Sequence, residues 1–517
     1  MAKNFRWSLD DSTKIDSGPP ARYQLQLRRV NLDKKSNEDS ELRRFTHGIC
    51  DHSQMNKTIL LVGATGAGKT TLINALVNYV MGVEFVDKLW FEVISDERTA
   101  LRVRPRLWKI VPYSLTIIDT PGYGHTEGIE RDQKIIQLLE GLFCIPEGMD
   151  TINAVGLVMN SSDSKLDERK AYILNSVTSL FGKDMEQNIV IMMTHTGSGK
   201  PRNALKALED AKIVCARDKK NEPVYFMFNN RQKEPIEGDS DEEAAEHAFK
   251  VSTKGIKKFT KFLETSKLQS LKTTLKVMKE RTRLTACIQN LQERVVEVEL
   301  KQMVITKNRE ELSQFKAEME KNKEFTVNTQ ETYKEKETIN AKWNNKAVTC
   351  NICEENCHYP GCTWALSPKM CEVMKKGECT SCTRKCPVDA HVKEKWKYVT
   401  KTRTVTKTSE EMKAEYEKNE GEKKSVLQNL EHEMSNLQQA KDKCLDEAFD
   451  LLEKLEKIAL NVDSVSSSVH LEFLIQKMKE KGDEEKIQKL EEMRDRMSKK
   501  TKAAANYCRS RCEALFI

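Results

Sequence analysis

Long apolar runs are missing from this sequence. No stretch approaches the ~18 consecutive apolar residues of a membrane span. The first residues, MAKNFRWSLDDSTK, contain no apolar segment of the kind that a secretory signal needs. Lipid attachment is not expected either, because Ala2 excludes myristoylation and the final CEALFI is not a prenylation box. These absences predict a cytoplasmic protein, in which cysteines are reduced or metal-bound.

A strong excess of one charge is also missing. The 517 residues carry 86 basic and 79 acidic side chains, a net charge of +7, and so mild a balance does not predict a nucleic-acid partner. Hydrophobic residues make up 38% of the chain and charged residues 32%. That composition is too polar for one large globule and predicts roughly two to four domains with long exposed helices.

One stretch carries a phosphate-binding pattern. Residues 57–78, KTILLVGATGAGKTTLINALVN, are typical of a buried strand, a glycine-rich loop and a helix. Glycines let backbone N–H groups converge on anionic oxygens, and the helix adds the positive end of its dipole. We expect Lys69 to contact the β- and γ-phosphates and Thr70 to bind Mg²⁺. The predicted nucleotide-binding residues of this loop are Gly63, Ala64, Thr65, Gly66, Ala67, Gly68, Lys69, Thr70 and Thr71.

A second motif agrees with the first. Residues 115–122, LTIIDTPG, read as an apolar strand that ends in Asp-x-x-Gly. The strand would place Asp119 beside the phosphate loop, where its carboxylate could orient Mg²⁺ and its waters. Gly122 would let its N–H approach a γ-phosphate, so that hydrolysis would release the following segment as a switch.

The order of elements around these motifs predicts a parallel α/β domain over residues 56–265, because apolar strands alternate with helical patterns. An N-terminal arm, residues 1–55, would pack on it through a short strand around Tyr23–Leu27 and a short helix at Glu41–Cys50. The final helix of the domain should run from about Glu242 to Thr265. The expected strands are Thr58–Val62, Leu115–Ile118, Ala154–Met159, Ile189–Met193 and Val224–Phe228, and the helices after the first are Asp132–Phe143, Asp167–Phe181 and Asn203–Cys215.

This domain resembles the septin-related GTPases of the immunity-associated nucleotide-binding and chloroplast import-receptor type, with an AIG1-type G domain. The resemblance rests on GATGAGKTTLINAL, LTIIDTPGYGHTEGIERD, IVIMMTHT and VYFMFNN, within about two-fifths of the chain. It is also similar to animal proteins that join such a domain to a long coiled coil. The resemblance implies GTP or GDP with Mg²⁺, G-domain dimers favoured by GTP, and a role in immunity.

Two motifs of ordinary GTPases are absent. The guanine-reading Asn-Lys-x-Asp is replaced by a Thr-His at the corresponding strand end, and the resemblance implies that His195 contacts the base, with Asn229 and Asn230 as later base contacts; a structural role for His195 stays open. Tyr123 stands where Ras-like proteins carry a water-positioning Gln, so hydrolysis is expected to be slow. Thr99 is the candidate switch I threonine, and no catalytic residue can be named.

Glycine and proline are almost absent between residues 268 and 345, where apolar residues recur at three- and four-residue steps. We expect a long helix over residues 266–345 and returning helices over 401–517, paired as an antiparallel coiled coil. The return arm should break at Asn461–Ser468, and a last helix should cover His470–Leu515.

Eight of the fifteen cysteines lie in the intervening segment, residues 346–400. Two Cys-x-x-Cys knuckles can complete a tetrahedral Zn²⁺ site, and the other cysteines suffice for a second zinc; disulfides and a redox-active thiol cluster are the alternatives. His358 and His391 lie nearby, and Trp396–Thr406 suggests a small β-ribbon at the tip of the hairpin. The candidate zinc ligands are Cys350, Cys353, Cys357, Cys362, Cys371, Cys379, Cys382 and Cys386.

The sequence thus predicts a GTP-binding protein, a slow GTPase, whose nucleotide controls self-association through its G domain and coiled coil to regulate an assembly. Other protein partners would bind the stalk or tip. One alternative is a scaffold whose nucleotide is structural and hardly turns over. The other is a zinc-hook-like coiled-coil ATPase, which residues 408–517 disfavour because they lack a second acidic strand and a signature motif.

Overall fold

The computed structural model divides the chain into two compact units. The first unit consists of Met1–Met278, Glu456–Val469 and Met493–Ile517, and the second of Lys279–Leu455 and His470–Glu492. The structure describes residues 6–31, 43–47, 55–93, 99–103, 113–120, 139, 142–143, 150–163, 165–166, 168–232, 234, 236, 238–319, 326–339, 346–359, 362, 365, 367–408, 425–461 and 465–496.

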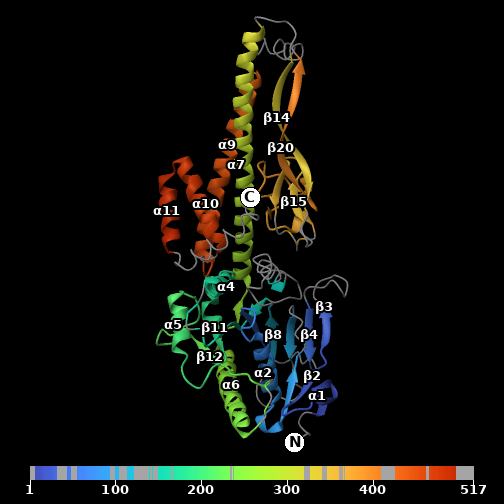
Figure 1. The fold of residues 1–517 in the computed structure, drawn as a ribbon, viewed down its shortest axis with the longest axis vertical. Coiled ribbons are helices and arrows are strands. Elements are labelled where there is room, and N and C mark those ends of the chain that lie inside the picture. The colour runs from blue at the N-terminus through green and yellow to red at the C-terminus, as the bar shows by residue number, and fades with distance from the viewer. Residues whose placement is uncertain are drawn as a thin grey trace. The chain divides into compact units, whose positions relative to one another are not determined.

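An eight-stranded sheet forms the centre of the first unit (Figure 1). Strands β12, β11, β10, β5 and β8 run parallel to one another, β7 pairs antiparallel with β8, β4 parallel with β7, and β3 antiparallel with β4. All five strands predicted from apolar runs are confirmed in this parallel part. In spatial order the strands are β12 (Tyr225–Met227), β11 (Ile189–Thr194), β10 (Ala154–Asn160), β5 (Asn56–Gly63), β8 (Ser114–Asp119), β7 (Thr99–Val103), β4 (Arg43–His47) and β3 (Arg28–Asn31).

Helices flank this sheet because its central strands are apolar on both faces, which a parallel sheet must bury. Helix α2 begins directly after the phosphate loop and packs in one core with β5 and α6. Of the predicted helix Asp132–Phe143, only Leu139, Leu142 and Phe143 lie among the described residues. The helices are α2 (Lys69–Met81), α4 (Glu168–Thr178), α5 (Arg202–Asp210) and α6 (Asp239–Thr265), with single 3₁₀ turns η1 (Phe85–Asp87) and η2 (Lys183–Asn188).

The N-terminal segment adds one short helix and several strands to the first unit. After the short α1 (Arg6–Asp10), β1 (Ser12–Asp16) and β2 (Ala21–Leu25) form a small sheet in which β2 pairs with β6 (Leu89–Glu92). The predicted strand near Tyr23 is confirmed, but the helix expected at Glu41–Cys50 is wrong, because Arg43–His47, its described part, forms β4. The backbone hydrogen bonds of β4 are made with β7, a distant segment, and the local sequence pattern could not reveal that pairing.

The first unit extends past the predicted boundary at residue 265. The short β13 (Gln269–Ser270) pairs with β9 (Thr151–Ile152), and the Leu271 N–H donates to the Asp150 carbonyl. A segment far along the chain also belongs here. The Leu460 N–H donates to the Phe181 carbonyl at 2.9 Å, and the Asn461 amide donates to the Asn175 side chain at 3.0 Å.

Long helices build one side of the second unit. Helix α7 (Lys272–Met319) and helix α9 (Ser425–Ile458) run antiparallel, because Cys287 faces Cys444 with their sulfurs 3.6 Å apart and Arg294 donates to the Ala440 carbonyl. The break predicted at Asn461–Ser468 is confirmed at Asn461, but Val465–Ser468 already belong to α10 (Val465–Lys481). The single last helix is wrong: Gly482, at φ +78°, separates α10 from α11 (Glu484–Arg496), and residues 497–515 lie outside the described part.

A long β-ribbon replaces the end of the predicted helix. Strand β14 (Thr326–Thr338) pairs antiparallel with β20 (Trp396–Thr408) over thirteen residue pairs (Figure 1). Residues 326–338, predicted as helix, and 401–408, predicted as the start of the returning helix, are therefore strands, and the described parts of the two long helices are Lys272–Met319 and Ser425–Ile458. The β-ribbon expected at Trp396–Thr406 is confirmed, and its partner is the segment that we predicted as helix. Threonine recurs through 326–338, and β-branched residues favour strands over helices.

The cysteine-rich segment folds between these two strands. A three-stranded sheet and a small hairpin hold it together. Its position at the tip of the hairpin, as predicted, is wrong, because it packs beside the early part of α7: Arg283 donates to the Glu372 carbonyl, and Asn290 to the Ser381 carbonyl. The elements are β15 (Ala347–Cys350), β16 (Glu355–His358), η3 (Pro368–Met370), β17 (Met374–Lys375), β18 (Glu378–Cys379), η4 (Val388–Ala390) and β19 (His391–Glu394).

Candidate functional site

The phosphate loop lies between β5 and α2 with the backbone that its pattern predicts. Gly66 and Gly68 take positive φ values of 78° and 88°, which glycine adopts without strain. Gly63 is required for a different reason: a Cβ there would lie 2.4 Å from the Val158 carbonyl oxygen of β10. Lys69 is buried, and its Nζ donates to the Gly63 and Ala64 carbonyls at 2.9 and 3.0 Å. The Lys69 ammonium therefore lies at the loop in which we expect it to contact phosphate oxygens.

Thr194, the last residue of β11, fastens this loop to the neighbouring strand. Its hydroxyl lies 2.8 Å from the Ala67 carbonyl and 3.1 Å from the Met159 carbonyl, and the side chain is buried. A Cβ at Gly68 would lie 3.2 Å from the Thr194 methyl, so the glycine also permits this close approach. Thr194 was not among the residues predicted for the site, although its place at a strand end, directly before His195, was a signal in the sequence.

Asp119 lies where the second motif places it. Strand β8 pairs with β5 so that Asp119 is opposite Leu61, two residues before the loop begins. The Asp119 Oδ1 atom is buried, and the next residue, Thr120, donates its hydroxyl to the Leu61 carbonyl at 3.0 Å. Thr70 is exposed at the start of α2. A carboxylate and a hydroxyl on adjacent elements are hard oxygen donors, which fit Mg²⁺.

The predicted base-contacting residues follow the two strands at the other side of the loop. His195 is exposed, has φ +53°, and its Nδ1 lies 3.2 Å from the Thr194 hydroxyl oxygen. The Asn229 N–H donates to Ser252 of α6 at 2.8 Å. The Asn230 Oδ1 atom is buried and makes no hydrogen bond to any residue that the structure describes. Among the described residues, this acceptor oxygen therefore has no donor, and it belongs to one of the residues that we expect to contact the base.

Of the predicted switch residues, Thr99 lies among the described residues. Thr99 begins β7, which pairs with β8. Gly122 and Tyr123 lie outside the described residues. The γ-phosphate contact and the position of the attacking water therefore stay predictions from the sequence.

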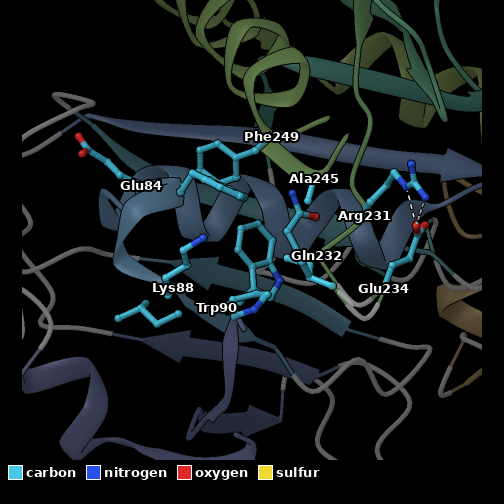
Figure 2. A pocket seen from close by; sticks show the side chains of 12 residues that line it. Glu84, Lys88, Trp90, Arg231, Gln232, Glu234, Ala245 and Phe249 are labelled. Carbon is cyan, nitrogen blue, oxygen red and sulfur yellow. Dashed lines mark hydrogen bonds and ion pairs between the residues drawn. The ribbon is translucent and has the colours of Figure 1, made fainter. Parts of the chain in front are cut away.

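A pocket in the same unit lies beside the predicted base-contacting segment (Figure 2). Trp90, Phe249 and Ala245 form its apolar part, and Arg231 pairs with Glu234 at one end. The pocket contains none of the residues predicted to contact phosphate, Mg²⁺ or base, and we assign it no role in nucleotide binding.

The eight predicted zinc ligands of the cysteine-rich segment come together with both nearby histidines. Three groups of donor atoms lie within 4.8 Å of one another inside each group. Within the described part of the chain none of these cysteines forms a disulfide. The groups are Cys350, Cys353, Cys382 and Cys386; Cys357, Cys379, Cys382 and His391; and His358, Cys362 and Cys371.

The charge state of these thiols is set by their neighbours. Hydrogen bonds from Cys353, and then from Cys357 and Cys379, hold the pKa of the Cys382 thiol well below its usual range. A hydrogen bond from Cys371 lowers the pKa of Cys362 to about 5, although burial opposes the shift. Soft thiolates with imidazole suit Zn²⁺ in tetrahedral coordination. These groups can therefore hold metal ions, and the histidines are ligands that the predicted set left out.

The parallel sheet, the loop after its central strand and Asp119 on the neighbouring strand together define a P-loop protein with the α/β GTPase fold. Residues 57–243 match the model of the AIG1 family. This part of the chain is therefore an AIG1-type domain, as the sequence motifs indicated.

Solved structures with a similar domain include Toc33 from Arabidopsis thaliana in complex with GDP and Mg²⁺, at 16% identity and a TM-score of 0.29, covering 41% of this chain and 86% of that one. Another is the bacterial dynamin GTPase LeoA from ETEC, at 15% identity and a TM-score of 0.25, covering 51% and 46%. Such values carry no inference about activity.

A curated relative is the ATP-dependent lipid A-core flippase of Acinetobacter baylyi, 20% identical over 270 residues. The match covers 42% of this chain and 45% of the flippase, so the chain spans less than half of that protein. In the described residues, no helix combines the length and apolar character required to cross a bilayer.

Proposed function

We propose that this protein binds GTP with Mg²⁺ in its AIG1-type domain, hydrolyses it slowly, and uses the nucleotide to control self-association. One observation carries the nucleotide site: the buried Lys69 lies on the carbonyls of a loop whose glycines adopt φ values of 78° and 88°. Lys69 would neutralise β- and γ-phosphate oxygens, and Thr70 and Asp119 would hold Mg²⁺, which supplies further charge neutralisation. A role in immunity belongs to the proposal by family resemblance, and a cytoplasmic location belongs to it because the sequence lacks long apolar runs.

Guanine preference is supported by Asn230. Its buried Oδ1 lacks a protein donor among the described residues, and guanine offers N–H groups on its Watson–Crick edge. Adenine has an acceptor at ring position N1, where guanine has an N–H, and its donor on this edge is the exocyclic N6 amino group. Because leaving the Oδ1 unpaired costs free energy, Asn230 would select guanine if it faces the N1 and N2 positions of the base. His195, held at φ +53° one residue after Thr194, would contact the base from the other strand end.

GTP can control self-association only if the monomer and the dimer bind the γ-phosphate with different affinity. The reason is that a ligand shifts an equilibrium only by its differential affinity for the two states. By resemblance, the GTP-bound domain would dimerise. The antiparallel helices α7 and α9 would serve as a stalk that forms a coiled coil and binds partners. The cysteine-rich segment would bind zinc and hold the chain between β14 and β20, where few apolar residues are available for a core.

Competition of GTP, GDP and ATP for the purified full chain, with molar mass measured in the same samples, tests this proposal. GTP preference, together with a dimer in a GTP analogue and a monomer in GDP, is the expected result. Asn230→Ala should reduce the preference for GTP over ATP, whereas Glu234→Ala, an exposed residue of the adjoining pocket that pairs with Arg231, should not. Preference for ATP would overturn the guanine assignment.

The absent Asn-Lys-x-Asp motif and Tyr123 in place of a glutamine favour a second function, a scaffold with structural nucleotide. A single-turnover measurement of GTP hydrolysis by the dimer distinguishes the switch from the scaffold. Release of phosphate coupled to loss of the dimer supports the switch, and tight GDP with no change of mass supports the scaffold.

A further inference from the structure

The cysteine-rich segment holds two donor groups that are not separate. One consists of Cys350, Cys353 and Cys386 and the other of Cys357, Cys379 and His391, and the Cys382 sulfur belongs to both. The donor atoms of each group, with Cys382 included, lie within 4.8 Å of one another. Six of these seven residues are buried and Cys353 is half-buried. The third group, His358 with Cys362 and Cys371, shares no residue with them.

His391 is oriented as a metal ligand. Its Nδ1 lies 2.9 Å from the Pro387 carbonyl, which can only accept, so the ring proton is on Nδ1. The other nitrogen, Nε2, is buried and lies among the sulfurs of Cys357, Cys379 and Cys382. It therefore presents a lone pair to the thiols around it. A backbone carbonyl on the far nitrogen is the usual support of a metal-bound imidazole.

Backbone N–H groups support the sulfurs in the same way. The Cys386 N–H donates to the Cys382 sulfur at 3.2 Å, and the Cys353 N–H to the Cys350 sulfur at 3.4 Å. The Cys379 sulfur accepts from the N–H groups of Ser381 and Cys382 at 3.3 and 3.4 Å. Each knuckle thus stabilises thiolates rather than neutral thiols.

The number of donors decides the arrangement. Two tetrahedral ions need eight donor positions, and seven side chains supply them only if one sulfur is shared. We propose that these residues hold a binuclear zinc centre, in which the Cys382 thiolate bridges both ions and His391 completes one of them. This inference rests on the zinc binding proposed above and specifies its stoichiometry and ligands.

The centre would support the contact with α7. The turn between Cys379 and Cys382 presents the Ser381 carbonyl to the Asn290 amide and the Arg294 guanidinium, each at 3.3 Å. Metal ions on both sides of Ser381 would fix that turn, so metal loading should order the surface that α7 packs against.

Cobalt substitution of the full chain tests the bridge. Two Co²⁺ ions that share one thiolate couple magnetically, so the paramagnetic resonance signal should account for two fewer ions per chain than the bound cobalt measured by mass spectrometry. Cys382→Ala should abolish this deficit and reduce the bound metal. His391→Cys, which retains a ligand, should keep both ions and the coupling, whereas His391→Ala should lose one ion and the deficit.

His358→Ala is the matched control, because it removes a ligand of the third group alone and should leave the deficit intact. Full spin intensity from protein that binds at least two cobalt ions would overturn the bridge and leave zinc binding standing. Protein that is folded by circular dichroism yet binds no metal would overturn both.

Discussion

Glu293 of α7 makes the stability of the second unit depend on pH. Its carboxylate accepts a hydrogen bond from the Asn356 amide at 3.0 Å, and Asn356 in turn pairs with both backbone groups of Tyr398 in β20. Burial raises the pKa of Glu293 from 4.5 to about 7, although the Asn356 hydrogen bond and the charges of Lys397 and Lys334 oppose the shift.

The sign follows from linkage. Because the folded-state pKa is raised, the stabilising contribution of the protonated carboxyl is present below pH 4.5 and is lost as pH rises through about 7. A shift of this size corresponds to about 3 kcal/mol at pH 8 for a wholly buried group. The side chain is only partly buried, so we expect about 1–2 kcal/mol. Glu293→Gln keeps the acceptor for Asn356 and removes the charge, and should stabilise the second unit by that amount.

Calorimetric unfolding of zinc-saturated protein at pH 6 and pH 8.5 is the assay. The transition of the second unit should be higher in Glu293→Gln than in the wild type at pH 8.5, and the gain should be smaller at pH 6. Burial lowers the pKa of His470 from 6.5 to about 4, so the folded protein loses stability as pH falls below 6.5. This effect is the same in the wild type and in Glu293→Gln. Glu378→Gln, at an exposed position, is the control and should leave the unfolding temperature of the second unit unchanged at both pH values. An equal gain at both pH values, or none, would refute the reasoning.

Three further perturbations test other parts of the molecule. Lys69→Ala should abolish nucleotide binding and leave the zinc content unchanged, since the two sites lie in separate units; loss of zinc from folded protein would contradict that division. Thr194→Val should raise the Kd for GTP about fivefold, because the Ala67 carbonyl loses a donor worth on the order of 1 kcal/mol, and Thr194→Ser should restore it; unchanged affinity in calorimetric titration would show that this contact does not hold the loop. Diamide should cross-link Cys287 to Cys444, whose sulfurs are 3.6 Å apart, and peptide mapping that finds these thiols still reduced after prolonged treatment would contradict the pairing of α7 with α9.

Much of the nucleotide site followed from the sequence, because the loop is a contiguous motif whose residues act through their own backbone. Gly66, Gly68 and Lys69 are within four residues of one another, and their spacing requires no knowledge of the rest of the chain. Asp119 is found by the same logic at the end of an apolar strand. The Thr194 contact could not be found in this way, since it connects residues 127 apart.

The secondary structure predicted from the sequence was wrong where a segment's structure depends on pairing with a distant segment. Residues 326–338 have few breakers and a helix-compatible pattern, and only pairing with Trp396–Thr408 makes them a strand. The same reason applies to Arg43–His47, which joins the sheet through β7. Local propensity is a weak preference that such pairing readily overrides.

The sequence alone determined which chemistry is available: a phosphate-binding loop, a carboxylate at a strand end and a store of thiols. Tertiary structure decided how these groups combine. Cys382 belongs to two donor groups, and His391 turns a buried nitrogen toward one of them, only because β15, β19 and the knuckle at Cys379 fold together. Cysteine spacing counts ligands along the chain, whereas coordination depends on distances in space, and the fold supplies those distances.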